Sequence, residues 1–361
     1  MDIHGHVEPA FELVREAFHQ ALRAVPGSGA ALAIWHDGHW IVDLWGGAAN
    51  AGGTASWQRD SIAQPYSTTK PFAAMCALVL VNRGLLDLDA PVQRYWPEFV
   101  APTTVRHVLS HQAGIVVLDE DVPTETFYDW DRMCSLLAQQ EPSWEPGSGL
   151  GESALFYGHL VGELVRRVDG RTPGPFLREE ICGPAGLDFV IGLGEDEQAR
   201  AVDLTFDNEE FRRINADGRP ELFQRAISNP PGAEDVYVVN SRAWRSAEIP
   251  AVNGHGTARG VAGLYAALLR GELLSPAITQ EATSAVCSGP DLILGEDVEW
   301  GLGFGVDDDG FGMGGIGGSM GVASTRGNYA MGFVPGAIGT FDRADALEGA
   351  LRSCLGLPPL E

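Results

Sequence analysis

Apolar residues near the two ends of the chain follow patterns that predict a helix, a β-hairpin and further strands. Between residues 8 and 24 they recur with the period of an amphipathic helix. Residues 30–35 and 40–46 are apolar runs on either side of an Asp-Gly turn, which is typical of a hairpin. Toward the C-terminus we expect glycine-rich strands and then a closing helix, at residues 301–306, 311–324, 329–334 and 344–354.

The middle of the chain is predominantly helical in pattern. Helical spacing, interrupted by Pro, Gly and Asp, runs from Ser67 to about Trp144. Further helices are expected at residues 154–167 and, after an N-capping Thr257, to about residue 269. Residues 192–250 are polar and irregular, and we expect them to cover the binding pocket. Sheet at both ends with helices between them predicts one interrupted α/β unit.

A serine and a lysine at the start of one predicted helix are the strongest chemical signal. Ser67 and Lys70 lie in the sequence Tyr-Ser-Thr-Thr-Lys, one helical turn apart on the same face. A desolvated lysine has a lowered pKa and can take the proton of a nearby hydroxyl, which makes that hydroxyl a nucleophile. The alternative is an N-capping serine beside a solvated lysine. The helix that follows is apolar nearly all round, so it should be buried, and this favours the nucleophile.

Several stretches together resemble the serine β-lactamase and penicillin-binding-protein superfamily, in particular the class C-like branch with the family VIII esterases. They are residues 66–114, Glu145-Pro146-Gly147, residues 161–170 and residues 240–250. The resemblance implies an antiparallel sheet flanked by helices, with an inserted, mostly helical lobe. We therefore expect a single domain over residues 1–361, with a sheet lobe at about 1–66 and 250–361 and a helical lobe at about 67–249.

The superfamily's proton-relaying tyrosine is replaced in this chain. Counting from the Pro146-Gly147 turn, the aligned residue is Glu152. A carboxylate beside Lys70 would raise the lysine's pKa and oppose its role as a base. Glu152 could instead be a general base, recognise a cationic substrate, or point to solvent at a helix start. Tyr157 is a second candidate for the role of the proton-relaying tyrosine, although its position in an apolar helix favours core packing. Ser153 is a third candidate for this role.

The strand motif that bears a cation in relatives is also altered. The matching residues are Met313, Gly314 and Gly315, followed by Ile316. The glycines would let the backbone approach substrate closely, whereas Met313 would line an apolar pocket. By resemblance, the backbone N–H groups of Ile316 and Ser67 form the oxyanion hole. The alternative for the glycine run is a kinked strand without a ligand.

Histidines and cysteines give no sign of a cofactor. His255 lies in a polar loop that could border the pocket, with loop capping as the alternative, and His111 is expected to be structural. The five cysteines are far apart and lack metal-ligand spacing, so we expect reduced thiols. No metal or other cofactor is therefore expected.

The net charge of −25 makes nucleic acid and anionic membranes poor partners. No apolar run is long enough to span a bilayer and no export signal is visible, so a cytoplasmic enzyme is expected. The expected substrate is a neutral or cationic small-molecule ester, thioester or amide, attacked by Ser67 to form an acyl-enzyme.

Carboxylesterase is the leading function. The alternatives are an acyltransferase that uses a second amine or alcohol substrate, and a non-catalytic binding protein on a degraded scaffold. The sequence leaves open the acyl donor and acceptor, the choice between hydrolysis and transfer, and the oligomeric state.

Overall fold

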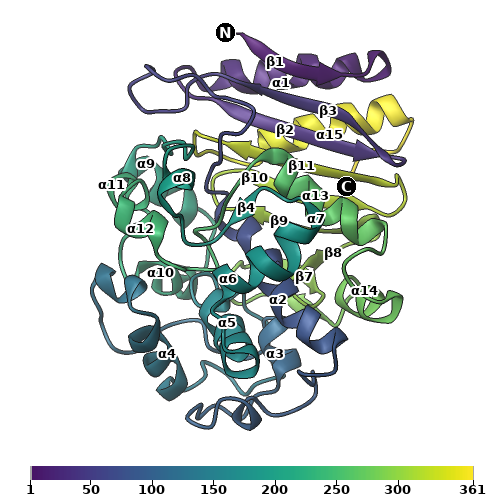
Figure 1. Cartoon of the computed structure of the whole chain (residues 1–361). Coiled ribbons are helices and arrows are strands. Elements are labelled where there is room, and N and C mark those ends of the chain that lie inside the picture. The colour runs from purple at the N-terminus through teal and green to yellow at the C-terminus, as the bar shows by residue number, and fades with distance from the viewer. Residues whose placement is uncertain (1, 361) are drawn as a thin grey trace.

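A nine-stranded antiparallel sheet forms one half of the molecule (Figure 1). The computed structural model describes residues 2–360. The strand order is β1-β3-β2-β11-β10-β9-β8-β7-β6, so strands from the two ends of the chain meet where β2 pairs with β11. The strands are β1 (Ile3–Val7), β2 (Ala30–His36), β3 (His39–Gly46), β6 (Cys287–Pro290), β7 (Asp297–Trp300), β8 (Gly305–Val306), β9 (Gly310–Gly315), β10 (Ser319–Ser324) and β11 (Tyr329–Pro335).

Two tight turns explain the hairpins of this sheet. The predicted β2–β3 hairpin is confirmed, with positive φ at Asp37 (45°) and Gly38 (96°) in its turn. The segment expected as one strand at residues 311–324 is instead two strands joined at Ile316–Gly318. Gly317 and Gly318 have φ values of 95° and 89°, a left-handed backbone that favours glycine, and this reverses the chain.

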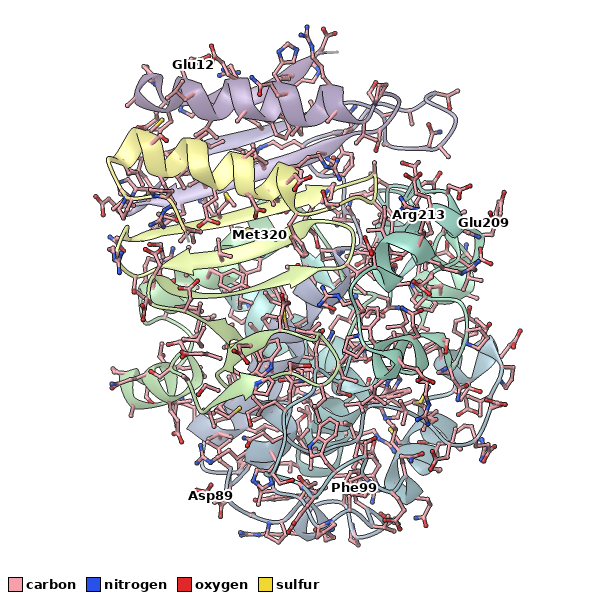
Figure 2. All side chains as sticks on the ribbon, turned by 180° about the vertical axis from the view of Figure 1, so that it is seen from behind. Glu12, Asp89, Phe99, Glu209, Arg213 and Met320 are labelled. Atoms are coloured by element: carbon pink, nitrogen blue, oxygen red, sulfur yellow. The ribbon has the colours of Figure 1, made fainter. Side chains whose placement is uncertain are left out.

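Helices cover both faces of the sheet. Helices α1 (Glu12–Ala24) and α15 (Asp342–Leu355) pack against each other and against one face, as Figure 2 shows from behind. Their shared core contains Phe18, Leu44, Met331 and Leu347, all fully buried. Helix α13 (Ala258–Leu269) packs against β11, β2 and β10. The predicted antiparallel sheet flanked by helices is confirmed.

The rest of the chain forms the helical part below the sheet in Figure 1. At its centre α2 (Lys70–Asn82) is buried over nearly its whole length, as its apolar sequence predicts, and packs against α5 (Tyr157–Asp169). The other α-helices of this part with five or more residues are α3 (Val105–Leu109), α4 (Trp130–Gln139), α6 (Pro173–Leu177), α9 (Asn208–Ala216), α10 (Glu221–Ser228), α12 (Arg242–Ser246) and α14 (Pro276–Ala282). A two-stranded ribbon of β4 (Phe189–Val190) and β5 (His255–Gly256) lies beside them. Short helices are α7 (Gly183–Ala185), α8 (Glu195–Gln198) and α11 (Val236–Val239).

Two expectations about this part need correction. Helix α5 begins at Tyr157 and not at residue 154, because residues 151–153 are held in an extended loop by hydrogen bonds to other segments. Residues 192–250 are not uniformly irregular, since α8 to α12 lie within them. None of the helices in residues 2–360 has the length and apolar character needed to cross a bilayer. The division into two lobes at residues 66 and 250 stays a prediction.

Candidate active site

Ser67 lies at a sharp turn into the buried helix α2. It is the second residue of a short 3-10 helix, Tyr66–Thr69, which continues directly into α2. Tyr66 has a φ of 44°, a strained conformation for a residue with a large side chain. Its phenol donates a hydrogen bond of 3.0 Å to the carbonyl of Ala233 and so helps to hold this turn. The next residue, Ser67, lines a cavity.

The hydroxyl of Ser67 and the amine of Lys70 are in direct contact. Nζ of Lys70 donates to Oγ of Ser67 at 2.7 Å and lies 3.5 Å from the carbonyl oxygen of Ala251. Lys70 is fully buried, whereas Ser67 is 5% exposed and lines the cavity. The predicted helical spacing therefore brings these two groups together.

The structure also brings Glu152 to this pair. Its Oε1 lies 2.8 Å from Nζ of Lys70, in an ion-pair contact, and the Glu152 side chain is 10% exposed. The backbone N–H of Glu152 donates to the carboxylate of Asp291, at 2.9 Å to Oδ2. Asp291 is buried and also accepts from the N–H groups of Ile293 and Leu294 and from the indole of Trp300. Asp291 thus holds the loop that presents Glu152.

Burial and charge act in opposite directions on this pair. Burial lowers the pKa of Lys70, and the attraction of Glu152 offsets only part of that change. Burial raises the pKa of the Glu152 carboxyl and is the largest single effect, but the attraction and hydrogen bond of Lys70 together with the attraction of His111 and Arg219 outweigh it, so the pKa lies below its ordinary value. The expectation that a carboxylate here would keep Lys70 charged is therefore only partly met, because the lysine is completely removed from water.

Strand β9 forms the wall opposite the nucleophile. The Thr68 hydroxyl donates to the carbonyl of Met313 at 3.2 Å, and the Ser319 hydroxyl donates to the carbonyl of Pro65 at 2.6 Å. These bonds tie β9 and β10 to the turn that carries Ser67. Met313, Gly314 and Ile316 line the cavity, and Ile316 begins the β9–β10 turn.

The glycines of β9 are needed for a different reason from the one expected. A Cβ on Gly315 would lie 2.2 Å from the carbonyl oxygen of Pro65, and one on Gly314 would lie 2.7 Å from the ring of Phe341. Because Gly315 has no side chain, β9 can pack closely against the turn that carries Ser67. The glycine is therefore needed for this packing, and not for a close approach of substrate to the backbone. Gly315 is not among the described residues that line the cavity.

Tyr157 and His255 are not brought to the cavity, which corrects two expectations. Tyr157 is fully buried, its phenol donates to the carbonyl of Leu109 at 3.1 Å, and burial raises its pKa. His255 is buried, with Nδ1 2.8 Å from the carbonyl of Asn253, and burial lowers its pKa to about 3. The Tyr157 hydroxyl and the His255 Nδ1 atom both have hydrogen-bond partners in the core, so both rings can be buried there. Ser153 likewise donates its hydroxyl to the carbonyl of Ile115, at 2.9 Å.

The cavity has a volume of about 1220 Å³ and runs from Ser67 and Glu152 along β7, β8 and β9 to α15. Two residues of this site carry no motif or spacing that would have indicated them in the sequence. Arg219, in the segment expected to cover the pocket, lines the cavity and donates to the carbonyl of Leu294 at 2.5 Å. Asp291 carries no motif and acts through tertiary hydrogen bonds alone. Of the cavity-lining residues in the described chain, only Arg219 is a lysine or arginine.

An SxxK serine beside a buried lysine, on this sheet and helix arrangement, defines a β-lactamase-like protein. The chain belongs to the Beta-lactamase family, whose sequence profile matches residues 16–343. It is similar to the crystal structure of a family VIII carboxylesterase, with a TM-score of 0.89 and 35% identity over 98% of this chain and 100% of that one. It is also similar to a penicillin-binding protein homologue from Caulobacter crescentus, with a TM-score of 0.88 and 33% identity over 98% and 100% of the two chains.

A sequence relative is the esterase/beta-lactamase LipL of Mycobacterium tuberculosis. It is 32% identical over 291 residues, which cover 74% of this chain and 65% of LipL. The match thus spans slightly less than two thirds of LipL. These similarities confirm the superfamily indicated by the sequence motifs.

Proposed function

We propose that this protein is a serine acyl hydrolase, and specifically a carboxylesterase that works through an acyl-enzyme on Ser67. The observation that carries the proposal is the contact of 2.7 Å between the Ser67 hydroxyl and the amine of fully buried Lys70, at the edge of a large cavity. The similarity to a family VIII carboxylesterase supports the same reaction class.

Acylation requires the neutral form of Lys70. Its amine takes the proton of Ser67 as Oγ attacks the ester carbonyl, and the ammonium that forms is stabilised by the Glu152 carboxylate 2.8 Å away. The developing oxyanion is bound by the backbone N–H groups of Ser67 and Ile316. Ser67 is the second residue of its helix, where a backbone N–H has no acceptor within the helix. The ammonium of Lys70 then returns its proton to the departing alcohol.

Deacylation uses the carboxylate of Glu152 as its base. Glu152 lines the cavity beside Ser67 and carries a carboxylate with a lowered pKa. It accepts a proton from the water that attacks the acyl carbon. The bond from that carbon to Oγ of Ser67 then breaks, the acid departs, and Oγ regains the proton held by Glu152, so Lys70 serves as the base of the first step and Glu152 as the base of the second. An amine or alcohol that enters the same cavity would take the place of water, and the reaction would then be acyl transfer.

The test is covalent labelling followed by turnover. Intact-mass analysis with a fluorophosphonate should show one adduct, and the adduct should be lost in Ser67→Ala. The wild-type protein should hydrolyse p-nitrophenyl acetate, with a ratio of free acid to amide that falls when an amine is added if transfer competes. A protein that neither reacts with the fluorophosphonate nor turns over the ester would be a binding protein, and the proposal would be wrong.

A further inference from the structure

The position of the Glu152 carboxylate depends on the backbone that carries it. Residues 151–153 form neither helix nor strand. Within the described part of the chain, the amine of Lys70 is the only polar partner of this carboxylate, at 2.8 Å. No second side chain therefore fixes its place. A shift of the loop by about 1 Å would separate the two charged groups, and a displacement of that size can lower a reaction rate roughly 100-fold.

Three consecutive backbone N–H groups hold this loop, and two of them donate to the same residue. Gly151 donates to the backbone carbonyl of His111 at 3.0 Å, and Ser153 donates to Nδ1 of that histidine at 3.2 Å. Between them, Glu152 donates to the carboxylate of Asp291 at 2.9 Å. His111 thus binds the loop directly before and directly after Glu152.

The imidazole of His111 accepts its hydrogen bond through an unprotonated Nδ1. Burial is the main cause that lowers the pKa of His111 to about 3. The charge of Glu152 opposes this change, and the charge of Lys70 adds to it. The ring is therefore neutral at every pH at which an ester assay is run, and Nδ1 stays available to the N–H of Ser153.

Packing alone does not account for these contacts. The His111 ring lies among the rings of Tyr157 and Trp300, with centroids 4.6 and 4.5 Å away. An apolar ring would fill the same space, but it would leave the N–H of the buried Ser153 without an acceptor. The indole of Trp300 also donates to Asp291 at 3.1 Å, so one tryptophan contacts both residues that bind the loop.

The backbone of His111 is strained. Its φ is 58°, a left-handed conformation that is uncommon for residues other than glycine. Of the four such residues in the described chain, Asp37 and Asn328 lie in hairpin turns, where short polar side chains adopt this conformation at little cost. The other two are Tyr66, which precedes the nucleophile, and His111. Strain of this kind persists only where the surrounding structure holds it, and it is common at functional sites.

Building on the proposed function, we infer that His111 is a positioning residue of the reaction, which places the Glu152 carboxylate against Lys70 through its carbonyl oxygen and its Nδ1. It is not among the described residues that line the cavity, so it acts only through Glu152. If the loop moves, Lys70 loses the attraction that favours its ammonium, and the water that attacks the acyl-enzyme loses its base.

The test compares two amide side chains at position 111. In His111→Asn, Oδ1 can take the place of Nδ1 as the acceptor, and Asn tolerates the left-handed backbone. In His111→Gln, the amide lies one bond further out, near the position of Nε2, and the N–H of Ser153 stays unpaired. Both variants lose the aromatic ring, so the difference between them reports the hydrogen bond.

Two rates are measured, the fluorophosphonate labelling of Ser67 against pH and the loss of the acetyl group from Ser67. Labelling rises with pH as Lys70 becomes neutral. In H111Q this rise should shift to lower pH by about one unit or more, because the attraction of Glu152 is lost. Deacylation should slow roughly 10- to 100-fold. H111N should keep the rise within about half a unit, and deacylation within about fivefold, of the wild type.

A double variant separates positioning from other effects. In H111Q/E152Q no carboxylate is left to place, so both rates should match those of E152Q alone. Phe18→Leu is the control for lost stability, since Phe18 is fully buried in the core between α1 and α15 and does not line the cavity. It should leave the pH profile unchanged.

The outcomes distinguish this inference from the proposed function. Wild-type rates in H111Q, or effects of H111Q and E152Q that add in the double variant, would overturn the inference and leave the hydrolase in place. A shift to higher pH in H111Q would also overturn it, because it would mean that water had reached Lys70. If the wild-type protein is not labelled at Ser67, the proposed function fails and the inference fails with it.

Hydrogen exchange in the wild-type protein decides if both amide variants fail to fold. Strong protection of the backbone amides of residues 151 and 153 supports the inference, because both donate to His111. Exchange as fast as in an exposed loop would show that His111 does not hold the loop, and the inference would be wrong.

Discussion

Nζ of Lys70 lies 2.8 Å from Oε1 of Glu152, and both side chains are withdrawn from water. Glu152 is the residue that the resemblance placed where the superfamily has a tyrosine, and its loop is held by a hydrogen bond from its backbone N–H to Asp291. Because the ammonium is stabilised by Glu152 and destabilised by burial, the protonation of Lys70 depends on a balance that a single substitution can shift.

Lys70 is expected to act through its neutral amine and not through its charge. Lys70→Ala should lower the rate of Ser67 acylation by roughly 1000-fold or more. Lys70→Arg should be equally inactive, because a guanidinium does not deprotonate in proteins. The measurement is the rate of fluorophosphonate labelling, with circular dichroism to verify folding. Substantial activity in a folded Lys70→Arg protein would contradict a base role.

The pH dependence of acylation should move when Glu152 loses its charge. The lysine must be neutral to react, so the labelling rate rises with pH through the lowered pKa of Lys70. Glu152→Gln removes the attraction that favours the ammonium, so this pKa falls further and the rising limb shifts to lower pH, by about 1–3 units. The exposed control Glu145→Gln should leave the limb in place. A shift to higher pH would contradict the assignment.

Glu152→Gln should also slow the second half of the reaction. Without a carboxylate to accept the proton of water, the acetyl-enzyme on Ser67 should accumulate, with deacylation slowed by roughly 100-fold or more. Rapid-quench mass spectrometry during turnover of p-nitrophenyl acetate measures the acylated fraction. If turnover falls and no acyl-enzyme builds up, Glu152 acts before acylation instead.

Tyr157 is expected to be dispensable for chemistry. Its phenol donates to the Leu109 carbonyl inside the core, 3.1 Å away. Tyr157→Phe should therefore reduce the free energy of unfolding by about 1 kcal/mol and leave kcat/KM within about threefold of the wild type. Chemical denaturation and ester turnover give the two values. A large loss of kcat without loss of stability would restore Tyr157 as a proton relay.

Gly315 should tolerate no side chain. Gly315→Ala would place a methyl group 2.2 Å from the carbonyl of Pro65, so the β9 wall and the Ser67 turn cannot keep their packing. We expect a loss of about 1–3 kcal/mol of stability together with strongly reduced labelling of Ser67. Gly349→Ala is the matched control, since it lies in helix α15 with no atom within 4 Å of the added methyl. It should be neutral or stabilising by up to about 1 kcal/mol.

Local pattern alone predicted much of this protein. The spacing of Ser67 and Lys70 within one helical turn is decided by neighbours in the sequence, and so is the buried character of α2. The hairpin from Ala30 to Gly46 depends on an Asp-Gly turn and two apolar runs, which are equally local. These features are readable because helical and strand periodicities operate over a few residues.

Local pattern does not show which distant groups reach the nucleophile; Glu152 was indicated through the resemblance to the superfamily, and the tertiary structure decided the rest. Glu152 meets Lys70 because its loop is held by Asp291, which lies 139 residues further along the chain, and no periodicity relates the two. The same holds for Arg219, which reaches the cavity, and for Tyr157 and His255, whose polar atoms find partners in the core. Contacts between remote segments depend on how the helices and strands pack in three dimensions and on where each polar atom finds its hydrogen bond. Neither is encoded in the order of neighbouring residues.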